Sequence, residues 1–298
     1  MIRLQIYFLL VFLSIGAFGQ QINFVKDDVM NSYMESGYAT EKFAPKGKVD
    51  DNRLRQGKWK DYEVIDDFSY CSIDGMPKQI FGKFLLYGEG EFLNGKRVGF
   101  WRIYTIEDKT YRKILHKEVT YVNGIENGSF KYFFPSKKLG ISGNYKNGEL
   151  DGKILSYHEN GSIYGLRYYI DGEKDGTHIY KFPNGNTELE HSFSKGIKNG
   201  LYQTFYDSGK LKEKFTYSMG KIDGIYQYYY PNGQLWIEKI YKEDLLMEVT
   251  NSYSPDGDLR DKGTISNGNG TVNYYTEAGE IYTVQTFKDG IKIKEEEK

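Results

Sequence analysis

Apolar and polar residues alternate with a period of two along most of the chain, in short stretches separated by glycine-containing turns. In "DGIYQYYYPNGQLWIEKIY", residues 223–241, apolar side chains lie two apart both before and after Pro-Asn-Gly. Such alternation predicts β-strands, and Asn-Gly between two strands predicts a tight hairpin turn with two residues at positive φ. The chain is therefore predicted to be all-β and built from β-hairpins.

Three ladders of glycine give this pattern a 24-residue period. The first ladder is Gly128, Gly152, Gly176, Gly200 and Gly224. A second ladder runs nine residues behind the first, and a third runs eleven behind the second. Each 24-residue repeat, numbered from its first glycine as position 1, is then one hairpin. Tandem hairpins predict an elongated, twisted antiparallel sheet.

The first turn, placed at positions 9 and 10, sets the predicted register of each hairpin. Position 7 faces 12, position 5 faces 14, position 3 faces 16 and position 1 faces 18, so Tyr230 is expected opposite Leu235 and Tyr228 opposite Ile237. Position 18 is always aromatic, and we expect its ring to cover the glycine at position 1. These structural rings are Tyr145, Tyr169, Phe193, Tyr217 and Tyr241.

The opposite, mostly polar face carries an aromatic row at position 6. It consists of Phe133, Tyr157, Phe205 and Tyr229, interrupted by Lys181. Because alternation directs these side chains away from the predicted core, they are our candidate partner-binding residues. Flat rings offer contact area at a low entropic cost, which suits a protein or a glycan.

Less regular repeats extend the pattern in both directions. "RQGKWKDY" at 55–62 matches "RVGFWRIY" at 97–104, and Gly270, Gly279 and Gly290 restore the repeat spacing near the C-terminus. We therefore place the repeat domain at residues 54–291. A non-repeat segment, 20–53, precedes it, and a charged tail, 292–298, follows it.

Residues 1–19 predict a signal peptide. One Arg is followed by an apolar run from Ile6 to Phe18, and small residues precede Gln20. The protein is then exported, and is periplasmic or extracellular after cleavage. Cys71 is the only cysteine, so no internal disulfide is expected, and burial and hydrogen bonding have to hold the fold.

Charge and side-chain chemistry restrict the function classes. A net charge of −1 argues against electrostatic binding of nucleic acid, and we expect no membrane contact. His178 and His191, at positions 3 and 16 of one repeat, are expected to replace aromatic rings instead of holding a metal. Aspartates before glycine at position 24 are expected to serve turns instead of calcium. We predict no catalytic residue, no cofactor and no metal.

Three stretches resemble the MORN repeat family, in the variant form found in bacterial secreted proteins and in relatives named antitoxins. They are "SGKLKEKFTYSMGKIDG" at 208–224, "DGIYQYYYPNG" at 223–233 and "NGQLWIEKIY" at 232–241. The resemblance covers most of the chain from Gly57 to Gly290, and it implies a series of hairpins used for partner binding. We expect a non-enzymatic scaffold that binds a protein. The alternatives are an antitoxin-like or immunity-like neutraliser of one protein, and a cell-surface glycan binder.

Overall fold

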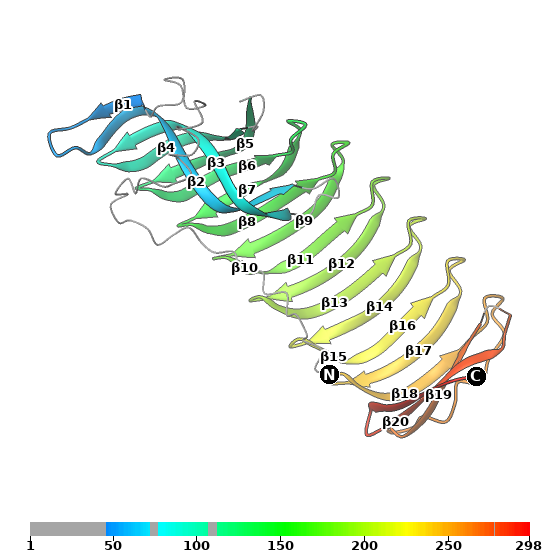
Figure 1. Cartoon of the computed structure of the whole chain (residues 1–298). Coiled ribbons are helices and arrows are strands. Elements are labelled where there is room, and N and C mark those ends of the chain that lie inside the picture. Colours follow the sequence, from blue (N-terminus) through cyan, green and yellow to red (C-terminus); the bar gives the residue numbers. More distant parts are fainter. Residues whose placement is uncertain (1–45, 72–76, 107–111, 277) are drawn as a thin grey trace. The chain divides into compact units, whose positions relative to one another are not determined.

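The computed structural model describes residues 46–71, 77–106, 112–276 and 278–298, and every regular element among them is a β-strand (Figure 1). Eighteen of these strands are hydrogen-bonded in one antiparallel sheet and three in a second. The all-β class and the tandem hairpins are confirmed. The described residues contain no helix long and apolar enough to cross a membrane. The predicted signal peptide, and residues 20–45 of the predicted non-repeat segment, lie outside the described residues.

The chain divides into two compact units. Of the described residues, 46–71, 77–106 and 112–151 belong to unit 1, and 152–276 and 278–298 belong to unit 2. The strands of unit 1 are β1 (Lys46–Val49), β2 (Arg55–Cys71), β3 (Pro77–Leu93), β4 (Lys96–Ile106), β5 (Lys113–Val122), β6 (Ile125–Phe133) and β7 (Leu139–Lys146). β8 (Glu149–Tyr157) begins in unit 1 and ends in unit 2.

Unit 2 continues the hairpins and ends in the smaller sheet. Its strands are β9 (Ile163–Ile170), β10 (Glu173–Lys174), β11 (Gly176–Lys181), β12 (Thr187–Ser194), β13 (Ile197–Phe205), β14 (Leu211–Ser218), β15 (Lys221–Ile222), β16 (Gly224–Tyr229), β17 (Leu235–Lys242), β18 (Leu245–Ser252), β19 (Gly270–Tyr275), β20 (Ile281–Lys288) and β21 (Ile291–Glu297). β19, β20 and β21 form the second sheet.

The predicted register holds along most of each hairpin and fails beside the first turn. Gly200 pairs with Tyr217 and Thr204 with Glu213, which are positions 1 with 18 and 5 with 14. A β-bulge follows, so the next pair joins positions 6 and 12 instead of 7 and 12. Tyr228 does pair with Ile237, but Leu235 lies opposite Tyr229, so the prediction for Tyr230 was wrong.

Turn chemistry explains the bulge. The backbone N–H of Gly233 donates to the carbonyl of Tyr230, and the N–H of Tyr230 donates to the carbonyl of Gln234, both at 2.8 Å. Only Gly233 of this turn has a positive φ, 95°. This is a type I turn closed by a glycine bulge, as Pro231 after the first turn residue favours. The turn with two positive-φ residues lies instead at positions 20 and 21, as in Asn147-Gly148 and Asp171-Gly172.

The bulge also turns positions 13 and 14 to the same side of the sheet. Trp236, at position 13, therefore stacks on Tyr230 with ring centroids 5.5 Å apart, and lies 5.3 Å from Tyr228. Tyr164, also at position 13, lies edge-on to His158 at position 7 of its own hairpin, with ring centroids 5.1 Å apart. We call this side, which holds positions 3, 5, 7, 13, 14, 16, 18 and 23, the aromatic face. The other side, with positions 2, 4, 6, 12, 15 and 17, is the polar face.

The glycine at position 1 has a different role from the one predicted. Its φ is positive throughout, for example 77° at Gly152 and 95° at Gly224, a conformation that residues with a Cβ rarely adopt. A Cβ built on either residue would meet no atom within 4 Å. The prediction that the position-18 ring covers this glycine was therefore wrong. The positive φ explains why glycine recurs at position 1.

Rings do cover glycines elsewhere, in unit 1. A Cβ on Gly90 would lie less than 3.0 Å from ring atoms of Trp101, and the same holds for Gly47 and Trp59. Each indole Nε1–H donates to two backbone carbonyls, at 3.1–3.2 Å. A guanidinium lies over each indole, Arg55 at 4.9 Å and Arg97 at 4.7 Å from the ring centroid. The two early stretches are thus structural copies of one another.

Repeated hydrogen bonds tie each hairpin of unit 2 to the next. Where position 7 is His or Tyr, its side chain donates to the carbonyl of the following position 6: His158 Nε2 to Lys181 at 2.8 Å, and the Tyr206 hydroxyl to Tyr229 at 2.6 Å. The position-24 side chain accepts from the backbone N–H of the following position 20, as the carboxylate of Asp175 does from Lys195 at 3.1 Å. The position-24 acids and amides therefore order the neighbouring turn.

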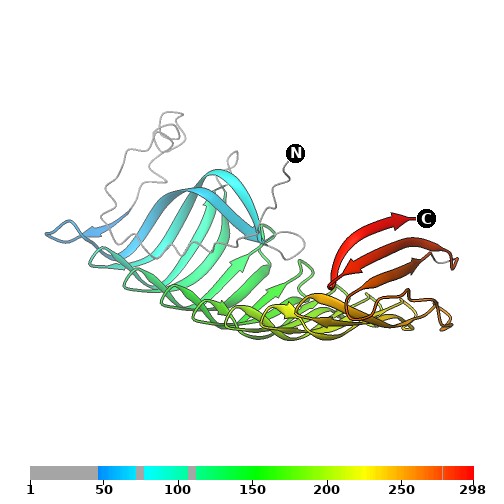
Figure 2. The ribbon, with the colours of Figure 1, turned by 90° about the horizontal axis from the view of Figure 1, so that it is seen from below.

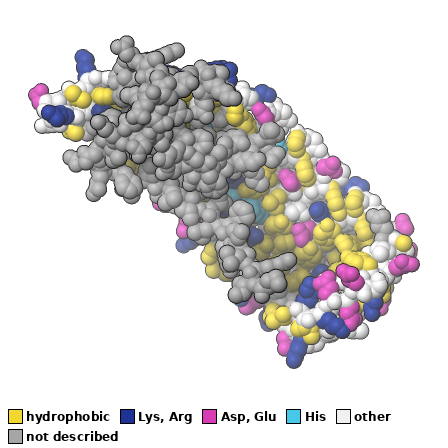
Figure 3. All heavy atoms as spheres, viewed as in Figure 1, with side chains coloured by type: hydrophobic (Ala, Val, Ile, Leu, Met, Phe, Trp, Pro, Cys, Tyr) yellow, Lys and Arg dark blue, Asp and Glu magenta, His cyan; other side chains and the backbone are white. Residues whose placement is uncertain are grey.

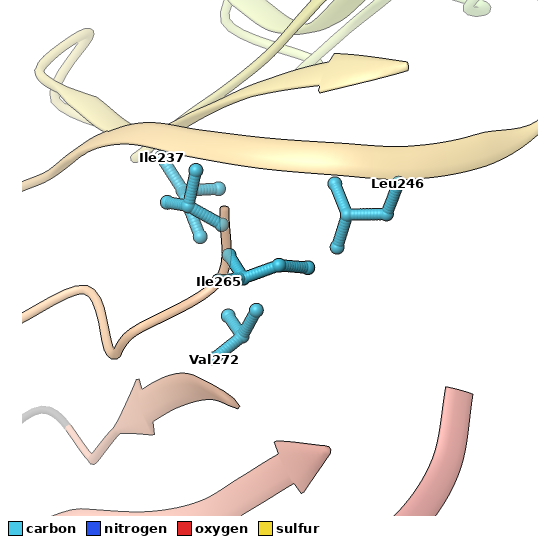
Figure 4. Close-up of a cluster of buried hydrophobic side chains, with 5 residues drawn as sticks. Ile237, Leu246, Ile265 and Val272 are labelled. Carbon is cyan, nitrogen blue, oxygen red and sulfur yellow. The ribbon is translucent and has the colours of Figure 1, made fainter. Parts of the chain in front are cut away.

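The last predicted repeat forms the second sheet. Gly270 pairs with Phe287 in the register of positions 1 and 18, while β21 adds a third strand that includes residues of the predicted charged tail. This sheet leaves the plane of β16–β18 (Figure 2) and packs on their aromatic face. Figure 4 shows Ile265 and Val272 against Ile237 and Leu246, a cluster completed by Val249.

Candidate interaction surface

The structure places the predicted position-6 row at the ends of strands. Phe133 ends β6 in unit 1, whereas Tyr157, Phe205 and Tyr229 end β8, β13 and β16 in unit 2. All four side chains are half-buried. Neighbouring hairpins bring the unit 2 members to a spacing of about 10 Å per repeat, two inter-strand distances.

Contacts of Tyr229 confirm that this row lies on the polar face. Its hydroxyl donates to Oε1 of Gln227 at 2.9 Å, and Nε2 of Gln227 donates to Glu238 at 2.8 Å. The bulge gives each ring a cross-strand neighbour at position 12, Leu235 in this repeat. The row is therefore a set of aromatic and apolar pairs in polar surroundings, and binding by it stays a prediction.

The aromatic face of unit 2 carries a second and more continuous row, which sequence reasoning did not single out. We call it the central row. It alternates positions 16 and 3 on successive strands, and comprises Arg167, His178, His191, Tyr202, Phe215, Tyr226 and Lys239. Since positions 3 and 16 were predicted to pair within a hairpin, the signal that was missed is their continuation into the next hairpin.

Ring contacts run along this central row. Tyr202 stacks on Phe215 at 4.5 Å, and Phe215 stacks on Tyr226 at 5.4 Å, with 23° between the ring planes in both pairs. His191 lies 6.2 Å from Tyr202 in an edge-on arrangement. Lys239 Nζ lies 5.6 Å from the centroid of Tyr226 and ends the row. Stacked and edge-on rings at these distances stabilise the sheet beyond the area they bury.

Some equivalent residues of the aromatic face are buried at β17–β18 and half-exposed at β11–β16. At position 14, Ile237 is 3% exposed beneath the β19–β21 sheet, whereas Leu189 is only half-buried. At position 23, Leu246 is 2% exposed and Ile222 is half-buried. Figure 3 shows hydrophobic side chains gathered over β11–β17. Equivalent residues therefore have a covering layer at β17–β18 and only partial cover at β11–β16.

Burial sets the electrostatics of the central row. Burial, then a 2.6 Å hydrogen bond to Glu213, raises the pKa of Tyr226. Burial lowers the pKa of Lys239, whose Nζ donates to the Tyr274 hydroxyl at 3.0 Å. Burial raises the pKa of Tyr274 to about 12. These hydroxyls are protonated at neutral pH and act as hydrogen-bonding groups.

His178 and His191 lie opposite each other, as predicted, with ring centroids 5.8 Å apart. Both contact Phe193, at 4.8 and 4.5 Å. Burial lowers the pKa of both rings, and that of His191 falls to about 4. Within the described residues, no group of three His, Cys, Asp or Glu side chains is placed to hold a metal ion.

Unit 1 offers a shallow hollow on its polar face, lined in part by Lys58, Lys60, Glu91 and Phe100. Its remaining charges are paired: Glu89 with Lys113 at 3.4 Å, and Arg102 with Glu118 at 3.2 Å. The Tyr87 hydroxyl also donates to Glu89 at 2.6 Å. The hollow therefore has mixed charge, and Glu89 and Arg102 in its lining already form ion pairs with other side chains.

A comparison with family models matches three segments of the chain, residues 150–171, 198–219 and 222–243, to the MORN repeat variant. Each segment runs from position 23 through one complete hairpin to position 20. The chain contains MORN repeat variants. The match confirms the MORN resemblance within these three segments, and the MORN hairpin is the structural repeat described above. The hairpin of β11 and β12, which carries His178 and His191, lies between two matched segments.

No curated protein matches this MORN-repeat chain. Among solved structures, one similar chain is in the Tc holotoxin pore of Photorhabdus luminescens with the TccC3-D651A mutation. It is 13% identical, and the match covers 85% of this chain but only 13% of that one. With a TM-score of 0.16, this likeness carries no argument about function.

Proposed function

We propose that this MORN-repeat protein is an exported, non-enzymatic scaffold, and that it binds a protein partner through the aromatic face of unit 2. One observation carries the proposal. The rings and aliphatic side chains of this face are buried where β19–β21 cover them, whereas Tyr180, Tyr202 and Tyr226 at β11–β16 are half-exposed around the buried rings of Phe193 and Phe215. A partner that covers β11–β16 would complete the layer that the chain supplies for itself at β17–β18.

The physical argument rests on area and rigidity. A sheet is stable when its apolar face is packed against a second layer. The half-exposed rings of Tyr202 and Tyr226 are already stacked on the buried ring of Phe215, so covering them costs little side-chain entropy. Aromatic side chains are also the residues most enriched in protein interfaces.

Export is supported by the sequence of residues 1–19, and the absence of enzymatic activity by the lack of a catalytic motif in the sequence. N-terminal sequencing of the protein from its own host tests the first, with Gln20 as the expected new terminus. Hydrolase and transferase assays on the purified protein test the second. Robust turnover would refute the non-enzymatic part.

The partner is tested by crosslinking pull-down and mass spectrometry in the native host. We compare the wild type with two variants whose folding is checked by circular dichroism, Tyr180→Ala/Tyr202→Ala on the aromatic face and Phe205→Ala/Tyr229→Ala in the position-6 row. We expect one protein to be enriched by the wild type and the position-6 variant, and lost with the aromatic-face variant.

The other outcomes separate the alternatives. Loss with the position-6 variant alone would move the site to the polar face. Retention by both variants would refute binding through either row. Capture of cell-wall glycan instead of protein would favour the glycan binder, and a toxic partner neutralised by the chain would favour the antitoxin-like function.

A further inference from the structure

Basic side chains gather at one end of the central row. Arg167, at position 16, lies next to His178, at position 3 of the following hairpin. Phe215 and Tyr226 occupy the same two positions and stack on each other. Lys174 Nζ lies 5.0 Å from the centroid of Phe193. Lys198 Nζ lies 4.8 Å from the centroid of Tyr217, and 3.3 Å from its hydroxyl. We call these three cations, with His178 and His191, the basic cluster.

Among the residues that the structure describes, few carboxylates act on these cations and histidines. Asp175 is the acid that acts on His178, and its carboxylate accepts from the backbone N–H of Lys195. Glu213, farther along the same face, accepts from Tyr226. Burial, then the charges of Arg167 and Lys198, lower the pKa of Lys174. Repulsion by Arg167 and Lys198 therefore adds to the effect of burial on Lys174.

Polar atoms of the cluster are also buried without a partner. Among the described residues, Arg167 Nε, His178 Nδ1 and both ring nitrogens of His191 have no hydrogen bond. His178 is 0% exposed, and its other ring nitrogen donates to the carbonyl of Tyr168 at 2.8 Å. Buried polar groups in folded proteins nearly always have partners, because leaving one unpaired costs about 1–3 kcal/mol.

The hairpin that holds both histidines is also the one that falls between two matched MORN segments. Tyr202 and Phe215 of the following hairpin stand where His178 and His191 stand here. The chain therefore places two imidazoles, which can hydrogen-bond, at positions where the following hairpin has Tyr202 and Phe215, and three cations lie beside them.

We infer that the basic cluster receives the carboxylates of an acidic segment of the protein partner, with apolar side chains of that segment packed on the flanking rings. This rests on the proposed function and specifies the chemistry of the partner. Charge complementarity selects the acid, since Arg and Lys provide donors that match carboxylate oxygens. The rings of Phe193 and Tyr217 lie about 5 Å from Lys174 and Lys198. A ligand that has apolar residues beside its acidic residue should therefore bind better than one that carries only negative charges.

The test uses a fluorescein-labelled peptide, Gly-Glu-Leu-Glu-Leu-Gly, and its twin with Gln at both Glu positions. Binding to the mature full chain is measured by anisotropy in low salt. We expect the Glu peptide to bind more tightly than the Gln peptide, and Lys174→Gln/Lys198→Gln to weaken it by about tenfold, the effect of two partly exposed charge contacts. Added salt should weaken binding through screening.

A matched control removes two cations from the polar face of the same unit. Lys153→Gln/Lys214→Gln should leave the affinity for the Glu peptide unchanged. Equal binding of the two peptides, or equal loss in both double variants, would overturn the inference. Binding to phosphatidylserine vesicles without binding to the Glu peptide would overturn it as well, in favour of a lipid headgroup.

The two proposals fail separately. If the native partner is lost with Tyr180→Ala/Tyr202→Ala but kept at full strength by Lys174→Gln/Lys198→Gln, the aromatic face binds the partner and the acidic chemistry is wrong. If no partner depends on the aromatic face, the proposed function fails whatever the peptides show.

Discussion

Replacing Gly90 by Ala should destabilise unit 1, although a Gly→Ala change in a strand commonly stabilises. The new Cβ would lie closer than 3.0 Å to ring atoms of Trp101, whereas ordinary contact begins at 3.4 Å. The indole has little room to yield, because it is 0% exposed and its Nε1–H donates to Glu91 and Val98, both at 3.2 Å. Overpacking of the strand by the ring is therefore unavoidable.

The expected cost follows from three contributions. Overpacking costs about 1–3 kcal/mol, and weakening the two indole hydrogen bonds adds about 1–2 kcal/mol. Ala lowers the conformational entropy of the unfolded chain, which stabilises the fold by about 0.4–1 kcal/mol. We expect a net loss of about 2–4 kcal/mol in the free energy of unfolding.

A double-mutant cycle with Trp101→Ala isolates the effect. Urea unfolding is followed by far-ultraviolet circular dichroism for the wild type, both single variants and the double variant. In the Trp101→Ala background, Gly90→Ala should be neutral or stabilising, since no ring remains above it. An equal loss in both backgrounds would refute the ring-over-glycine argument.

Three further perturbations test other parts of the fold. Tyr206→Phe and Tyr230→Phe should each lower the free energy of unfolding by about 1 kcal/mol, by removing the hydroxyl bond to the next hairpin; a loss as large in Tyr202→Phe, whose ring stacks, would contradict this. Val249→Ala, at a 0% exposed residue, should cost about 2–3 kcal/mol and speed hydrogen exchange in β19–β21, and unchanged exchange there would contradict the packing of the two sheets. Burial lowers the pKa of His116 to about 3 from 6.5, so the unfolded chain takes up the proton first. Stability should therefore fall as the pH drops from about 6.5 towards 3, by at most roughly 4–5 kcal/mol, and His116→Phe should flatten this dependence in urea titrations.

Sequence periodicity alone predicts the hairpins and most of their register. The 24-residue glycine ladder located every regular repeat, and alternation from Gly200 to Thr204 placed the pairs with Tyr217 and Glu213 correctly. What alternation alone could not supply was the turn geometry. Pro231 signals a type I turn, and the resulting bulge moved Leu235 to the polar face and Trp236 to the aromatic face.

Features that join one hairpin to the next were harder to predict. The central row continues from Tyr202 and Phe215 of one repeat to Tyr226 of the next, so pairing rules within a single hairpin do not reveal it. The last repeat kept its internal register, with Gly270 opposite Phe287, yet it folds onto the aromatic face instead of extending the sheet. Its sequence spacing is the same in either arrangement, so only tertiary packing distinguishes them.

Site-specific photocrosslinking in the native host tests the central claim most directly. A benzophenone side chain is placed at Tyr180 or Tyr202 on the aromatic face, and at Gln203 or Lys214 on the polar face of the hairpin that holds Tyr202. We expect a crosslink to one protein from the first pair and none from the second. A crosslink from the polar-face positions alone, or none from any position, would contradict a scaffold that binds through the aromatic face of unit 2.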